Sequence, residues 1–283
     1  MYYLKNKFRP AAKRTLAYIL LGFWTLLIFG ILSWAVITSL KTNSEIFTNP
    51  WGLPEKLNLE NYVKAWKISK MGIYFKNSVI TVIPAVIINI LLSAMAAYAL
   101  SRFRFKLRKF FIGYFVLGMS VPVQLLIVPQ YTLMKNLHLT GSLFGLIIVY
   151  VVVSFSFNVF LLTGFFRSLP HEIEESAIID GCGEFRLFFQ IMFPLAQPGI
   201  ITSAGLLFVS AWNEYLLALI YVGTKPELRT MALGMYNLRS SMQYADYGGF
   251  FAAIVLMIIP SLGVFLLLQK YIMEGLTLGA VKG

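Results

Sequence analysis

The stretch NSVITVIPAVIINILLSAMAAYALS, residues 77–101, lies between Lys76 and Arg102 and contains no charged side chain. A helix needs about 20 mostly apolar residues to cross the hydrocarbon core of a bilayer. The stretch is too long for a β-strand and too apolar for a helix on the surface of a soluble protein. It therefore predicts a helix that spans a membrane.

Five further apolar runs resemble this stretch in length and composition. They cover residues 15–40, 110–134, about 142–166, about 199–220 and 247–269. Because lipid offers no hydrogen bonds to the backbone, a spanning segment must satisfy its own polar groups, as a helix does. The sequence therefore predicts an all-α integral membrane protein with six transmembrane helices.

The composition supports the same class of protein. Of the 283 residues, 58% are hydrophobic and only 13% are charged, whereas about a quarter of a soluble domain is charged. The net charge of +12 does not predict a nucleic-acid partner here, because basic residues also accumulate at the cytoplasmic ends of membrane helices. One cysteine, Cys182, excludes an intrachain disulfide and a cysteine-based metal site.

The distribution of basic residues predicts the orientation in the cell membrane. Residues 1–14 and residues 101–109 each hold five Lys or Arg, but residues 135–141 hold one. Basic residues concentrate in short cytoplasmic segments, so both termini are expected in the cytoplasm. The longer segment 41–76 carries six lysines on the outer side, and we interpret it as an exception that three glutamates partly offset.

The runs divide the chain into three parts. Residues 1–71 are expected to form a cytoplasmic N-terminus, the first transmembrane helix and an extracytoplasmic loop. The first run is long for a signal peptide and lacks a small-residue cleavage site, so a retained anchor is expected. Residues 72–271 form the main transmembrane domain, and residues 272–283 form a cytoplasmic tail.

The segment RSLPHEIEESAIIDGCGEFRLFFQIMFPL, residues 167–195, differs from the rest of the chain because it holds five acids and two bases. Pro170 suits the first turn of a helix, and acids after it interact favourably with the helix dipole. Gly181 supplies the left-handed position that ends a helix. A second helical stretch is predicted from Glu184 to about Phe193, where Pro194 ends it. The segment therefore predicts a helix–turn–helix on the cytoplasmic side, with Ile173, Ala177 and Ile178 as an apolar stripe available to a partner.

Residues in this segment match a known pattern. Glu175-Ser176-Ala177, three residues, Gly181, nine residues and Ile191-Met192-Phe193-Pro194 resemble the EAA loop of ABC importer permeases, with Ser176 and Phe193 replacing alanine and leucine. Other stretches resemble the second permease of carbohydrate importers of the maltose and glycerol-3-phosphate types. They are residues 38–41, 49–51, 61–62, 211–215 and 275–283.

The resemblance implies a division of labour among several subunits. Such a permease pairs with a second homologous permease, with two copies of an ATP-binding subunit and with an extracytoplasmic solute-binding protein. The first short helix of the loop, about Pro170–Asp180, would be the coupling helix that docks on the ATPase. The resemblance assigns this coupling to Glu175, Ser176, Ala177, Asp180, Gly181, Ile191 and Pro194.

The chain itself is not expected to be an enzyme or to bind a cofactor. It contains no G-x-x-x-x-G-K-[ST] motif, which cradles nucleotide phosphates. ATP and Mg²⁺ are therefore expected on the partner ATPase. His138 and His171 are too far apart in the predicted topology to share a metal ion.

Polar residues within the spans are candidates for a solute path, because such residues are rare in lipid. They are Asn158, Asn213, Glu214 and Gln124. Hydrogen bonds between helices or between subunits are the alternative role for these side chains.

The predicted function is that of a permease subunit that translocates a sugar or oligosaccharide, driven by ATP hydrolysis in a separate subunit. A permease for glycerol-3-phosphate or another polyol is an alternative within the same family. An ion-coupled secondary transporter is an alternative of another class, but it needs ionisable relays at the membrane midplane, where only Glu214 is available.

Overall fold

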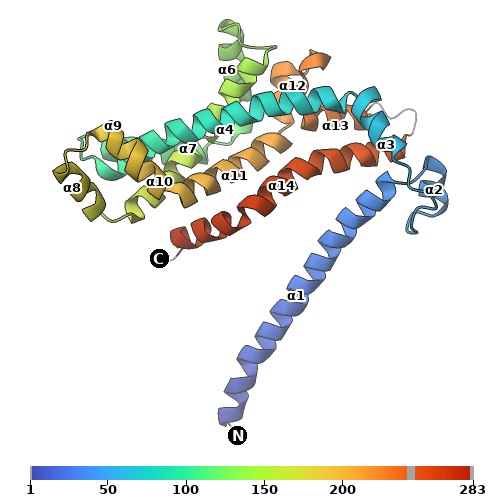
Figure 1. The fold of residues 1–283 in the computed structure, drawn as a ribbon, viewed down its shortest axis with the longest axis horizontal. Helices are drawn as coiled ribbons and strands as arrows, with labels where there is room; N and C mark the ends of the chain where they lie inside the picture. Colours follow the sequence, from blue (N-terminus) through green and yellow to red (C-terminus); the bar gives the residue numbers. More distant parts are fainter. Residues whose placement is uncertain (1, 241–245, 281–283) are drawn as a thin grey trace. The chain divides into compact units, whose positions relative to one another are not determined.

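The computed structural model describes the backbone of residues 2–240 and 246–280 and the side chains of residues 14–236, 238 and 246–271. Throughout these ranges the regular elements are helices (Figure 1), so the predicted all-α fold is confirmed. Two features of the sequence lie outside the described residues. They are the basic side chains before Arg14 and the last three residues of the 275–283 stretch.

The chain forms two compact units, Met1–Ser69 with Leu238–Leu256, and Lys70–Asn237 with Met257–Gly283. The helices before residue 70 are α1 (Tyr2–Ser39), α2 (Asn43–Thr48), α3 (Glu60–Val63) and η1 (Lys64–Ile68). Those that follow are α4 (Met71–Arg102), α5 (Arg108–Ser120), α6 (Val123–Asn136), α7 (Leu143–Ser168), α8 (Glu172–Ile179), α9 (Glu184–Arg186), η2 (Leu187–Met192), α10 (Phe193–Leu195), α11 (Gln197–Asn213), α12 (Leu216–Val222), η3 (Pro226–Leu228), α13 (Met231–Ser240) and α14 (Tyr247–Ala280).

In the first unit, hydrogen bonds join the three short stretches that follow α1. The buried ammonium of Lys41 donates to the carbonyl oxygens of Asn49 at 2.8 Å and Pro50 at 3.2 Å. The amide of Asn61 donates to the carbonyl oxygens of Ser39 at 2.9 Å and Lys41 at 2.8 Å. The residues that resembled carbohydrate permeases at 38–41, 49–51 and 61–62 therefore form one local structure.

In the second unit, α4, α7 and α11 run side by side (Figure 1). Small and short polar residues of α4 face this contact, which lets the helices approach closely. The fully buried ones include Ala85, Asn89, Ser93, Ala94 and Ala97. The contact places the C-terminal ends of α4 and α7 next to the segment predicted to be a coupling loop.

Among the described residues, four helices are long and apolar enough to cross a membrane by themselves. They are residues Arg14–Ser39, Met71–Arg102, Leu143–Ser168 and Tyr247–Tyr271. Two bent pairs of helices bring the number to six if each pair counts as one span. The prediction of six spans agrees with the larger of these two counts. It stays a prediction, because the count depends on whether each bent pair is one span.

The third predicted run, residues 110–134, is not one straight helix. It consists of α5 and α6, which meet at 102°. Val121 is extended, with φ −83° and ψ 118°, and Pro122 follows it. A proline disfavours helical geometry in the residue before it and lacks an N–H group, which accounts for the break.

The fifth predicted run, about residues 199–220, is also interrupted. The helix α11 ends at Asn213, and Glu214 adopts an extended conformation with φ −73° and ψ 123° before α12 begins. The apolar run therefore continues through a break that hydropathy alone does not reveal.

Candidate functional site

The helix α8 carries the first half of the EAA-like segment. Glu172, Glu174 and Glu175 occupy its first turn, where carboxylates interact favourably with the helix dipole. Gly181 follows with φ +78°, a conformation that side chains disfavour. The N–H of Gly181 donates to Ile178 at 2.9 Å and that of Cys182 to Ala177 at 2.9 Å. This pair of bonds is a Schellman motif and ends α8.

The second half of the segment is helical from Glu184 to Leu195 and includes the π-helix η2. The sequence predicted that this stretch ends at about Phe193, before Pro194, and it ends at Leu195, one residue after the proline. The chain then turns by 74° between Leu195 and Gln197, at the start of α11. Pro194 lies in α10, at the C-terminal end of the helical stretch.

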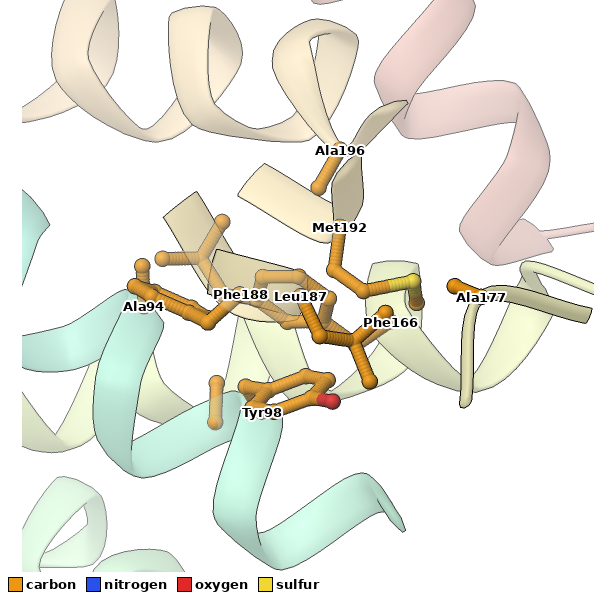
Figure 2. Close-up of a cluster of buried hydrophobic side chains, with 10 residues drawn as sticks. Ala94, Tyr98, Phe166, Ala177, Leu187, Phe188, Met192 and Ala196 are labelled. Carbon is orange, nitrogen blue, oxygen red and sulfur yellow. The ribbon is translucent and has the colours of Figure 1, made fainter. Parts of the chain in front are cut away.

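The inner face of the segment is apolar and packs on α4 and α7. Its buried apolar residues and Ala196, which directly follows the segment, pack in one cluster with residues of α4 and α7. The members are Ala177, Leu187, Phe188, Met192 and Ala196 on one side and Ala94, Ala97, Tyr98, Leu162 and Phe166 on the other. Figure 2 shows the rings of Tyr98, Phe166 and Phe188 together and the end of Met192 pointing toward Ala177. The ring centroids of Tyr98 and Phe188 are 5.2 Å apart. Burial of this face fixes the segment to two long helices.

Arg102, the last residue of α4, connects the same three elements through its guanidinium group. Its Nη2 donates to the carbonyl oxygen of Phe166 at 2.7 Å and to that of Leu169 at 2.8 Å. Its Nε lies 3.2 Å from Oε1 of Glu174. Its Nη1 lies 2.8 Å from Nδ1 of His171. One side chain of α4 therefore caps the end of α7 and reaches the first turn of α8.

The ion pair between Arg102 and Glu174 is largely removed from water. The side chains are 2% and 11% exposed, respectively. The facing Nε and Oε1 atoms form a charge pair without hydrogen-bond alignment. Burial raises the pKa of the Glu174 carboxyl, and Arg102 and His171 offset only part of this rise. The pair therefore compensates incompletely for the loss of water around the carboxylate.

The outer face of the segment combines apolar and acidic side chains. Ile178, Ile179 and Phe185 are 57%, 85% and 77% exposed, respectively. The acids Glu175 and Asp180 are exposed beside them. Scattered exposed apolar side chains are common, but three within eight residues give this segment exposed apolar surface of the kind that protein partners cover. We call Ile178, Ile179, Phe185, Glu175 and Asp180 the outer face.

The predicted coupling residues divide between the two faces. Glu175, Ser176, Asp180, Gly181 and Pro194 are exposed, Ile191 is half-buried, and Ala177 is buried in the core. Of the apolar stripe expected to be available to a partner, Ala177 instead packs inside this chain. The sequence did not identify Arg102 or Glu174 as part of the site. Glu174 lies three residues before Ala177 and therefore shares its helix face. This spacing could have indicated from the sequence that the two side chains are buried together.

Asn158 of the predicted solute path lies between α4 and α7. Its Nδ2 donates to Oδ1 of Asn89 at 2.6 Å, and Nδ2 of Asn89 donates to the carbonyl oxygen of Val151 at 2.6 Å. Ser93 donates to the carbonyl oxygen of Asn89 at 2.6 Å. Asn158 is 1% exposed, so it takes part in a buried network that joins the two helices.

Glu214 is half-buried and caps α12. Its Oε1 accepts the N–H of Leu217 at 2.8 Å, and its Oε2 accepts the N–H of Ala218 at 3.1 Å and the hydroxyl of Tyr150 at 3.3 Å. Its neighbour Asn213 is exposed, although its Nδ2 donates to the carbonyl oxygen of Val209 at 2.8 Å. These bonds give Glu214 a structural role and leave Asn213 more accessible.

Gln124 is exposed in the first turn of α6, next to the break after α5. Within the part of the chain whose side chains are described, no cluster of three or more His, Cys, Asp or Glu has the proximity needed to hold a metal ion. The segment between α7 and α11 therefore remains the most distinctive candidate site among the described residues.

The chain resembles a known family over most of its length. Residues 89–277 match the model of the binding-protein-dependent transport system inner membrane component. The diacetylchitobiose uptake system permease protein NgcG of Streptomyces coelicolor is 38% identical over 268 residues, which cover 94% of this chain and 88% of that protein. The multiple sugar-binding transport system permease protein MsmG of Streptococcus mutans is 31% identical, with 94% and 96% covered.

A solved structure has the same fold. It is a chain of a bacterial ABC transporter involved in the import of the acidic polysaccharide alginate. The TM-score is 0.80 at 21% identity, and the match covers 92% of this chain and 96% of that chain. The family match across α4 to α14 and the relatives at 38% and 31% identity establish that the chain belongs to the binding-protein-dependent inner membrane components, the non-catalytic permease subunits of ABC importers.

Proposed function

We propose that this chain is the permease subunit through which a carbohydrate enters the cytoplasm. Its relatives from Streptomyces coelicolor and Streptococcus mutans are named for diacetylchitobiose and for multiple sugars. Similarity over 94% of the chain, at 38% and 31% identity, supports a solute of the same chemical class. No feature of the site favours the polyol or the ion-coupled alternative.

The outer face is the observation that carries the proposal of ATP coupling. Ile178, Ile179 and Phe185 offer apolar surface, and Glu175 and Asp180 offer charge at its edge. Exposed apolar side chains accompanied by polar ones are typical of a specific protein interface. Its partner is the ATP-hydrolysing subunit, and closure of two such subunits on ATP moves α8 and with it the spanning helices.

The orientation follows from the same assignment. A segment that docks on a nucleotide-hydrolysing subunit faces the cytoplasm, and the excess of basic residues in 101–109 supports this side. Both termini then lie in the cytoplasm, and the hydrogen-bonded stretches after α1 lie outside. The remaining partners are a second homologous permease, a second ATPase copy and an extracytoplasmic binding protein that delivers the sugar.

Of the candidate residues for the solute path, Asn213 and Gln124 are the better choices. Both side chains are exposed, although Nδ2 of Asn213 lies 3.3 Å from Oγ of Ser261 in α14. Asn158 is buried, and half-buried Glu214 caps α12. Sugar hydroxyls both donate and accept hydrogen bonds, and a side-chain amide complements both. We therefore assign a sugar contact to Asn213 and Gln124 and a structural role to Asn158 and Glu214.

Substitutions at Gly181 test the docking of the loop. An added Cβ meets no atom of this chain within 4 Å, but the positive φ of +78° strains any side chain. Gly181→Ala and Gly181→Leu therefore share a strain of about 1–2 kcal/mol. Only leucine projects far enough to obstruct a partner. In proteoliposomes with the complete importer, we expect Gly181→Leu to abolish most ATP-driven uptake and Gly181→Ala to retain most of it.

The same experiments also have outcomes that would contradict the proposal. Equal uptake by both variants at wild-type level contradicts docking at Gly181. Uptake by this chain alone, without an ATPase subunit, contradicts the proposed function as a whole. Co-purification of the ATPase with Gly181→Ala, together with its loss from Gly181→Leu, supports the outer face as the interface.

A further inference from the structure

The guanidinium group of Arg102 is the most highly connected side chain around the loop. It belongs to α4, donates to two carbonyl oxygens at the end of α7, and pairs with Glu174 in α8. Its side chain is 2% exposed, so these contacts face little competition from water. The three elements it joins are the two packed spanning helices and the helix proposed to dock on the ATPase.

We propose that Arg102 is the positioning residue that makes α8 and the ends of α4 and α7 move as one body during transport. The inference rests on the proposed function and assigns to this chain the link between the docked loop and the spanning helices. Without such a link, a push on α8 is absorbed by movement of the loop. With it, the same push is transmitted to both spans.

The chemistry of arginine fits this task better than that of lysine. The planar guanidinium presents five N–H donors in fixed directions, so one group bonds several acceptors at once. Here Nη2 bonds Phe166 and Leu169, and Nε faces Glu174. A lysine ammonium placed here reaches only part of this set, because its donors radiate from a single atom.

The apolar contacts of the loop complement the polar link. Ala177 of α8 is buried in the cluster that contains Tyr98 of α4 and Phe166 of α7. These contacts hold the loop against the helices but define no single orientation, because hydrophobic attraction is not directional. The bonds of Arg102 are directional and fix how α8 is oriented on its support.

A nearby arginine provides a matched control. Arg108 donates from Nε to the carbonyl oxygen of Leu100 at 2.8 Å and from Nη2 to that of Ser101 at 3.1 Å. It therefore also caps a helix, but its bonds stay within α4 and the residues that follow it. Substitution of either arginine removes a helix cap, whereas substitution of Arg102 also removes the link to α8.

The decisive measurement is the amount of sugar transported per ATP hydrolysed. The complete importer is reconstituted in proteoliposomes with loaded binding protein, and uptake and ATP hydrolysis are measured on the same sample. We expect Arg102→Gln to lower this ratio by about 2- to 30-fold, the range of 0.5–2 kcal/mol found for residues that couple distant sites. We expect Arg108→Gln to leave the ratio unchanged.

Milder variants keep the test decisive if Arg102→Gln does not assemble. Glu174→Gln removes the charge facing Arg102 and keeps the size of the side chain. The ratio is expected to fall in Glu174→Gln and in Arg102→Lys, with the ATPase still bound. The proposal is overturned if the ratio is unchanged in both Glu174→Gln and Arg102→Lys. It is also overturned if Arg108→Gln lowers the ratio as much as Arg102→Gln does.

A distance measurement separates this proposal from the proposed function. Spin labels are attached at Glu172→Cys, an exposed position of α8 outside the outer face, and at Arg104→Cys. The background is Cys182→Ser, because Cys182 is the single cysteine. The mean distance between the two labels should be the same in the nucleotide-free and the ATP-bound importer. In Arg102→Gln the distribution of distances should broaden. A constant distance in both proteins overturns the role of Arg102 even when ATP-driven uptake by the unsubstituted protein confirms the function.

Discussion

The two ends of α11 are both interruptions in a helical run, but different kinds of contact stabilise them. At the N-terminal end, the segment 184–195 meets α11 at 74°, and residues of α4 and α7 hold that segment. At the C-terminal end, Glu214 bonds two N–H groups that follow it by three and four residues. The first end depends on distant parts of the chain, while the second is mainly a local cap.

The difference affects how a force at each end is transmitted. A local cap stabilises a short helix whatever the surrounding helices do. A break held by distant helices moves only together with those helices. The N-terminal end of α11 is therefore suited to transmit movement from the loop, and the C-terminal end is suited to keep its own shape.

The largest effect is expected at Gly199, near the N-terminal end of α11. A Cβ at this position clashes with the ring of Phe165 in α7. We expect Gly199→Ala to destabilise the protein by about 1–3 kcal/mol, as overpacking of a core does. Thermal unfolding of the purified importer measures this loss.

Gly263 is the matched control for that substitution. It also lies inside a helix, but an added Cβ meets nothing within 4 Å. Gly263→Ala should be neutral or stabilising by up to about 1 kcal/mol, because alanine favours the helix. If Gly199→Ala raises the melting temperature as much as Gly263→Ala does, close packing does not hold this end of α11.

An intermediate effect is expected at the other end. Glu214→Ala removes the cap of α12 and should destabilise the protein by about 0.5–2 kcal/mol. Glu214→Gln should lose less, because an amide oxygen still accepts one of the bonds. The amount of sugar transported per ATP should not change. A large increase in the KM for uptake at an unchanged melting temperature would instead assign Glu214 to the solute path.

The smallest effect concerns the pH dependence of the N-terminal end. Because burial raises the pKa of Glu174, the folded protein binds this proton more tightly than the unfolded chain does. The stabilisation from this tighter proton binding is fully present below the pKa that Glu174 has in the unfolded chain. It is lost as the pH rises through the pKa that Glu174 has in the folded protein. The stability of the unsubstituted protein relative to Glu174→Gln should therefore fall as the pH rises from about 4, the ordinary carboxyl range.

Melting temperatures of both proteins over the same buffers measure this trend. Glu175→Gln serves as the control, since Glu175 lies on the exposed side of the same helix. A relative stability of the unsubstituted protein that increases with pH contradicts a raised pKa at Glu174. If the stability of the unsubstituted protein relative to Glu175→Gln falls with pH in the same way, the effect comes from the net charge of α8 and not from the burial of Glu174.

Much of the loop could be predicted from its own residues. Pro170, the acids that follow it and Gly181 predicted a short helix with a glycine end, and α8 spans Glu172–Ile179. Gly181 has the positive φ that its role required. The second helix was predicted to end at about Phe193, before Pro194, and it ends at Leu195, one residue after the proline.

The inner and outer faces of α8 could not be assigned with the same success. Ala177 was expected on a stripe for a partner, but it lies in the core of its own chain. The composition of a helix indicates that one face is apolar, and it does not say whether this chain or another one covers that face. The position of α8 on α4 and α7 decides the question.

The amino-acid sequence by itself determined the class of the protein, its apolar runs and the pattern of its acidic loop. These properties depend on residues close together in the chain, through run length, helix capping and backbone preference. Only the tertiary structure brought Arg102 to Glu174 and Asn89 to Asn158. Those pairs depend on the packing of α4 against α7, which is a sum of many weak contacts between distant residues and leaves no local pattern in the sequence.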